Sequence, residues 1–164
     1  MFLLDIPVLL ELRKAGSDRI DAGVLGWATA TPRQKLFIPA LALLELERRI
    51  LAAERTDKAG GAALRSWLDD QVVTAFEGRI LPVDAAVARK AAALPLPERE
   101  AMLGATALVH GLTLVTRYIA GFRTARLKVF SPWGYAPEAI GEDEDWREAG
   151  KSSPVWLKKM FLRF

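Results

Sequence analysis

The chain has 164 residues, 23 basic and 20 acidic side chains, a formal net charge of +3 and no cysteine. The lack of cysteine excludes disulfides, thiol nucleophiles and cysteine-based zinc sites, and it suits a reducing cytoplasm, the location we expect. The apolar start, MFLLDIPVLL, carries Asp5 and lacks a basic leading segment, so a signal peptide is not expected. No apolar run reaches the roughly 18 residues that span a bilayer. A chain of this length is expected to form one domain with its own core.

Short apolar runs alternate with longer amphipathic stretches along the chain. The pattern predicts a strand over 1–5, helices over 8–14 and 18–28, a strand over 36–38, a helix over 40–55, a turn over 56–61, a helix over 62–76, a strand over 80–83, helices over 85–94 and 98–109, and strands over 112–115 and 127–130. Pro7 fits the first turn of a helix, Asp84 fits an N-cap, and Gly78 and Gly111 fit helix ends. This alternation predicts an α/β fold with a parallel sheet covered on both faces.

Ligands of open α/β sheets bind beyond the carboxyl ends of the strands. That rule selects Asp5, which follows the first predicted strand, and the loop after Thr116, which follows the strand over 112–115. We therefore expect a functional site where these two ends of strands meet.

Four segments carry a family resemblance. They are MFLLDIPVLLEL (1–12), FIPALALLELERRI (37–50), FEGRILPV (76–83) and EREAMLGATALVHGLTLVTRYIAGF (98–122), followed by Pro132 and Trp133. In this order they resemble a PIN domain, in particular the VapC-like toxins of bacterial toxin–antitoxin pairs. The resemblance covers about residues 1–133 and implies a three-layer sandwich whose mostly parallel central sheet is flanked by helices.

The resemblance also implies a function. VapC-like toxins are metal-dependent ribonucleases, which cleave single-stranded RNA with water activated by Mg²⁺ or Mn²⁺. Both ions prefer carboxylate oxygens, and an ion relieves the repulsion among clustered carboxylates. The implied partners are a second copy of the chain, in a homodimer, and a small VapB-like antitoxin that blocks the acidic pocket.

Three acids match the positions of the family's metal ligands and catalytic residues. Asp5 follows the first strand, Glu45 lies in the helix after the second strand, and Glu100 opens a later helix where the family has Asp. Each acid has a simpler interpretation. Asp5 could only stabilise a helix N-terminus, and Glu45 could pair with Arg49 four residues on. At the third position, Glu98 is the solvated alternative to Glu100.

Several residues depart from the family's pattern. Ile6 and Pro7 replace a hydroxyl and an amide, Tyr118 stands where the family has Asn or Asp, and Gly121 stands where a further Asp is often found. Glu100 is one methylene longer than Asp, which moves its carboxylate by roughly 1.5 Å. The remaining acids suit one ion rather than two. The departures support an alternative function, a PIN scaffold that has lost catalysis and acts as a binding or regulatory module. Accidental similarity of an unrelated α/β protein is a third interpretation.

Residues 134–164 form a C-terminal extension to this domain. Its first part, GEDEDWRE, is acidic, and its second part, KSSPVWLKKMFLRF, alternates basic with aromatic and aliphatic residues. We expect so many apolar side chains to be covered. The extension is predicted to pack on its own domain or on a second copy, with a frayed terminus and association with a membrane surface as the other interpretations.

Overall fold

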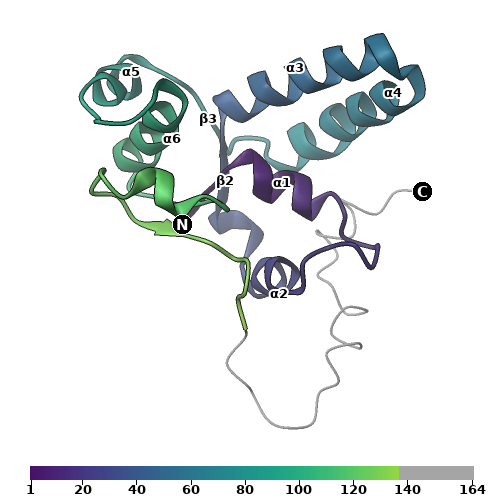
Figure 1. Cartoon of the computed structure of the whole chain (residues 1–164), viewed down its shortest axis with the longest axis horizontal. Helices are drawn as coiled ribbons and strands as arrows, with labels where there is room; N and C mark the ends of the chain where they lie inside the picture. Colours follow the sequence, from purple (N-terminus) through teal and green to yellow (C-terminus); the bar gives the residue numbers. More distant parts are fainter. Residues whose placement is uncertain (137–164) are drawn as a thin grey trace, which may run out of the picture.

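The structure is a computed structural model that describes residues 1–136 (Figure 1). Its elements in order are β1 (Phe2–Leu4), α1 (Ile6–Leu12), α2 (Ala22–Ala30), η1 (Arg33–Lys35), β2 (Leu36–Pro39), α3 (Ala40–Thr56), α4 (Lys58–Ser66), η2 (Trp67–Val73), β3 (Ile80–Leu81), α5 (Ala85–Ala92), α6 (Glu98–Val109), β4 (Thr113–Val115), η3 (Ile119–Phe122) and β5 (Val129–Phe130). Here η1 and η3 are short 3₁₀ helices, and η2 is a π-helix that continues α4. The strands form one sheet in the order β3-β2-β1-β4-β5, and each neighbouring pair is parallel. The predicted α/β class is confirmed. In the described part of the chain, no helix has both the length and the apolar character needed to cross a bilayer.

The two faces of the sheet are covered by different helices, as alternation along the strands requires. Leu4 and Val115 belong to a core shared with α1, α2 and α3, whereas Leu3 and Leu114 pack with α6 on the opposite face. In Figure 1 the pair α5 and α6 lies on one side of the strands, and the hairpin of α3 and α4 lies on the other side of the view. Helices on both faces of a parallel sheet make the predicted three layers.

The register of the central strands places two chain segments side by side at the carboxyl edge. Leu4 of β1 lies opposite Val115 of β4, and the Asp5 N–H donates to the Val115 carbonyl at 3.0 Å. The next residues, Asp5 and Thr116, are therefore neighbours although they are far apart in the sequence. The helix that follows β2 begins at the same edge, so α3 directs its first turns toward this point.

Helix ends follow the caps that the sequence offers. Asp84 caps α5 by accepting a hydrogen bond from the Val87 N–H, as predicted. Gly78 and Gly111 have φ angles of 69° and 63°, in the left-handed region, and both lie at helix ends as expected. The prediction of a helix from residue 18 was wrong, because Asp21 caps α2 and the helix begins at Ala22.

The predicted turn over 56–61 was also wrong. Helix α3 runs to Thr56, and α4 begins at Lys58 with Asp57 as its N-cap. The glycine at position 61 serves close packing rather than flexibility. A Cβ at Gly61 would lie 2.6–2.7 Å from atoms of Glu54, including two of its backbone atoms. Helices α3 and α4 can therefore approach each other closely only while position 61 has no side chain.

The predicted extension over 134–164 lies outside the described residues except for 134–136, so its packing stays a prediction. Trp133, just before it, packs against the main core, as expected, and carries the Arg117 guanidinium 5.4 Å from its ring centroid.

We predict that Gly61→Ala destabilises the protein by about 2 kcal/mol, because the new methyl group overlaps the Glu54 backbone. The matched control is Gly104→Ala in α6, where a Cβ would meet only leucine methyl groups at 3.4–3.6 Å. The control is expected to be neutral or stabilised by up to about 1 kcal/mol, since alanine favours helix over glycine. Urea unfolding followed by circular dichroism measures both. Equal effects of the two substitutions would contradict the close approach of α3 and α4.

Candidate active site

Asp5 is buried at the carboxyl edge of the sheet, with 1% of its surface exposed. It is the N-cap of α1, and its Oδ1 accepts a hydrogen bond from the Ile6 N–H at 2.8 Å. Its Oδ2 accepts one from the hydroxyl of Thr116, also at 2.8 Å. Two donors from two elements therefore fix the orientation of this carboxylate. Asp5 is therefore a helix cap, as the simpler interpretation holds, but it also contacts Thr116.

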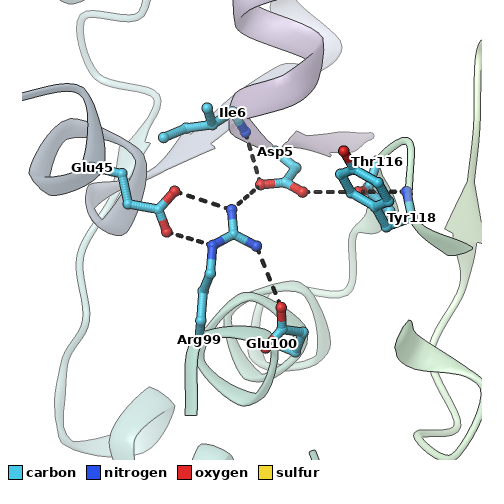
Figure 2. A network of polar contacts seen from close by, with 7 residues as sticks. All are labelled: Asp5, Ile6, Glu45, Arg99, Glu100, Thr116 and Tyr118. Atoms are coloured by element: carbon cyan, nitrogen blue, oxygen red, sulfur yellow. Dashed lines mark hydrogen bonds and ion pairs between the residues drawn. The ribbon is translucent and has the colours of Figure 1, made fainter. Parts of the chain in front are cut away.

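The three acids singled out in the sequence surround the guanidinium of Arg99 (Figure 2). From the first turn of α6, Arg99 Nη2 donates to Asp5 Oδ1 at 2.7 Å and to Glu45 Oε2 at 3.0 Å. Arg99 Nε donates to Glu45 Oε1 at 2.6 Å, which completes a two-pronged contact. The Glu100 carboxylate lies 3.7 Å from Arg99 Nη1. The structure thus brings Asp5, Glu45 and Glu100 together, with a cation between them.

The electrostatics of this cluster keep Arg99 charged. Burial alone would lower the pKa of the guanidinium, but its hydrogen bonds and charge interactions with Glu45 and Asp5 prevail and raise the pKa above its ordinary value. The Arg99 side chain is 37% exposed, so one edge of the cluster faces solvent. Arg99 is therefore a permanent positive charge at the mouth of an acidic site.

The simpler interpretation is wrong for Glu45 and correct for Glu98. Glu45 pairs with Arg99 from α6 and not with its helix neighbour Arg49. Glu47, two residues on, faces another way and forms an ion pair with Arg65 of α4 at 2.6 Å. Glu98 is exposed, as expected of a solvated residue. Of these acids, Glu45 is the one directed at the site.

The residues that depart from the family's pattern also lie around the site. Ile6 and Pro7 form the first turn of α1, where Ile6 contributes only its backbone N–H to Asp5. Tyr118 is 64% exposed and donates its backbone N–H to Thr116 Oγ1 at 3.2 Å. A Cβ at Gly121 would lie 4.0 Å from Glu100 Cγ, so an acid at position 121 would adjoin the cluster. Positions 118 and 121 therefore both lie beside the cluster.

The kind of donor present suits a hard divalent cation, because carboxylate and hydroxyl oxygens converge here. The arrangement with Arg99 in place does not. Across residues 1–136, no three Asp, Glu or His side chains are gathered closely enough to hold one metal ion. The acids match such an ion in chemistry, and Arg99 takes the contacts that the ion would need.

Two residues of the cluster were missed by sequence reasoning. From the sequence, Thr116 serves only to locate the loop that follows it, and its side chain is given no role. Arg99 was not considered, although its position in the first turn of a helix indicates that it needs an acidic partner. A cation in the first turn of a helix opposes the helix dipole, so Arg99, between Glu98 and Glu100 in α6, required a compensating partner elsewhere.

The family model described as "PIN domain" matches residues 3–118 of the chain, which include all the residues of the cluster. The chain belongs to the PIN domain family.

Relatives place this PIN protein among the VapC-like toxins. It is 32% identical over 142 residues to the VapC ribonuclease Y4jK of Sinorhizobium fredii, covering 81% of this chain and 98% of that protein. It is 29% identical over 143 residues to the toxin FitB of Neisseria gonorrhoeae, covering 81% and 99%. The crystal structure of FitAcB from Neisseria gonorrhoeae superimposes with a TM-score of 0.70 at 26% identity, covering 81% of this chain and 99% of that one. The resemblance drawn from the four segments is confirmed.

We predict that Thr116→Val destabilises this PIN protein by about 1–3 kcal/mol, because the buried Asp5 Oδ2 loses its hydrogen-bond donor. Thr106→Val is the matched control. Thr106 is equally buried, but its hydroxyl donates to the Met102 carbonyl within α6, so its loss leaves no charged atom without a partner. The free energy of unfolding in urea measures both variants, and a loss no larger in Thr116→Val than in the control would contradict this role.

Proposed function

We propose that this PIN protein is the toxin of a toxin–antitoxin pair and hydrolyses single-stranded RNA in a reaction that depends on Mg²⁺ or Mn²⁺. The observation that carries the proposal is the convergence of Asp5, Glu45 and Glu100 on one cationic group at the carboxyl edge of the sheet. The relative named VapC ribonuclease and the relative named a toxin support the same function. The three acids are the proposed catalytic and metal-binding residues.

Each acid has a distinct place in this proposal. A divalent cation held by them would activate water and offset the charge that develops on the phosphate. Asp5, whose carboxylate is oriented by the Ile6 N–H and the Thr116 hydroxyl, would provide one ligand of the ion. The side chains of Glu45 and Glu100 are 20% and 26% exposed, so both can be reached from solvent, as a phosphate group would require.

Single-stranded RNA suits the surroundings of the site. Tyr118 presents an exposed aromatic ring in the loop after β4, next to Thr116. Unpaired bases stack on such rings, which a base inside a duplex cannot do. The aromatic residue that replaces a polar one in the family's pattern could therefore bind substrate beside the acids.

The proposed partners follow from the family and from charge. We expect a homodimer and a small VapB-like antitoxin, whose inserted basic or aromatic segment would block the acidic pocket. Three carboxylates against one guanidinium leave the cluster negative, which favours a basic segment. A toxin that cleaves RNA would act in the cytoplasm.

Cleavage of a fluorescent single-stranded RNA by the purified full chain tests the catalytic proposal. We expect cleavage with Mn²⁺ or Mg²⁺, its loss in EDTA, and a rate at least about 100-fold lower in Asp5→Asn, because a neutral amide replaces a charged ligand that would hold the ion. Glu98→Gln is the matched control, since Glu98 is an exposed acid of the same helix as Glu100, and its rate should match the wild type.

Two other outcomes would contradict the proposal. Equal cleavage by Asp5→Asn would identify a contaminating nuclease. An absence of cleavage with either ion would favour the non-catalytic binding module, and co-purification of a small protein with the full chain would then still support the toxin role.

A further inference from the structure

Arg99 uses the same oxygen atoms that a metal ion would need. Its Nη2 bridges Asp5 Oδ1 and Glu45 Oε2, and its Nε contacts Glu45 Oε1. The other Asp5 oxygen accepts the hydroxyl of Thr116. Both oxygens of Glu45 and both oxygens of Asp5 are therefore already bonded within the described chain (Figure 2). A metal ion bound by these two acids would have to replace Arg99 in these contacts.

We propose that Arg99 is a built-in counter-cation that competes with a divalent metal ion for Asp5, Glu45 and Glu100. Binding of the ion and departure of the guanidinium are then a single exchange. The inference rests on the proposed function for the identity of the competing ion. Under this inference, Arg99 determines the free metal concentration at which the ion occupies the site.

Charge makes the exchange favourable when metal is available. Three carboxylates around one guanidinium leave two negative charges unmatched, whereas a divalent ion in its place would leave one. The two cations cannot share the site at low cost, because like charges a few ångströms apart repel strongly away from bulk water. Occupancy by Arg99 therefore excludes the metal ion, and occupancy by the metal ion excludes Arg99.

The exchange starts with the departure of one accessible side chain, after which the acids can close around the ion. Arg99 is 37% exposed, whereas Asp5 is almost completely buried and is held by donors from α1 and from Thr116, the residue after β4. Gly121 places no side chain against Glu100, which leaves that side of the cluster open. The position of Arg99 in the first turn of α6 also favours its release, since the helix dipole repels a cation there.

Mn²⁺ binding to the full chain, followed by the electron paramagnetic resonance signal of free Mn²⁺, tests the competition without relying on catalysis. We expect Arg99→Gln to bind Mn²⁺ at least about tenfold more tightly than the wild type. In the wild type the ion must displace the hydrogen bonds of Arg99 to the acids, and the loss of even one such charged bond is worth about tenfold in affinity. Arg65→Gln is the matched control. Arg65 also contacts two glutamates, Glu47 and Glu54, but on another face of α3, so its loss should leave Mn²⁺ affinity unchanged.

Thermal unfolding provides a second readout. In EDTA, Arg99→Gln should unfold at a lower temperature than the wild type, because its three acids repel without a cation, and Mn²⁺ should raise its Tm more than that of the wild type or of Arg65→Gln. If Arg99→Gln does not fold without metal, Arg99→Lys keeps a positive charge without the two-pronged contact. Its Mn²⁺ affinity should then lie between those of the wild type and of Arg99→Gln refolded with Mn²⁺.

Chemical rescue tests the same exchange in the opposite direction. In Arg99→Ala, millimolar guanidinium should weaken Mn²⁺ binding, and sodium at the same ionic strength should not. Equal Mn²⁺ affinity of the wild type and Arg99→Gln would overturn the inference and leave the ribonuclease proposal intact. An absence of Mn²⁺ binding by every variant would overturn both.

Discussion

The contact between one guanidinium and three carboxylates holds the carboxyl edge of the sheet together. Asp5 comes from the end of β1, Glu45 from α3, and Arg99 and Glu100 from α6, so the cluster joins helices that cover opposite faces of the sheet. Without a cation, acids that converge this closely would repel one another, and the buried Asp5 would be the least tolerable of them. A positive charge between these acids is therefore needed for this edge of the sheet to be stable, whether or not the site is catalytic.

The fold leads to this cluster by a short sequence of constraints. Parallel pairing aligns the carboxyl ends of β1, β2 and β4, so the residues that follow these strands share one edge. Asp5 then serves two purposes, because it caps α1 and also turns its second oxygen toward Thr116. Close packing of the small-residue helix α6 against Leu3 and Leu114 brings its first turn to the same point. The site is a consequence of the sheet's topology and of the alignment of helix ends.

The sequence predicted the fold well because its signals were local. Alternating apolar runs indicated the strands, and Asp84, Gly78 and Gly111 marked helix ends that the structure confirms. It failed at 56–61, where a turn was predicted but Gly61 in fact allows two helices to approach. That distinction depends on a neighbour in space, Glu54, which periodicity cannot reveal.

The candidate site was predictable only in part, for the same reason. The acids at 5, 45 and 100 could be placed by the strand-end rule and by family resemblance. Their partner could not, since the contacts of Arg99 with Asp5 and Glu45 join residues 94 and 54 positions apart. The family resemblance implies a metal ion between these acids, and the structure places an arginine there. Both cations satisfy the same electrostatic need, which is why the acids alone could not distinguish them.

The ¹H–¹⁵N spectrum of arginine side chains tests the central claim most directly, with the Arg99 signal assigned through its loss in Arg99→Lys. In the metal-free protein, the Arg99 Nε–H should exchange slowly with water and resonate apart from exposed arginines, because it donates to Glu45. Saturation with Mg²⁺ should move it into the region of the exposed arginines. An Arg99 signal that already lies among the exposed arginines without metal, or one that saturating Mg²⁺ leaves unchanged, would contradict the account.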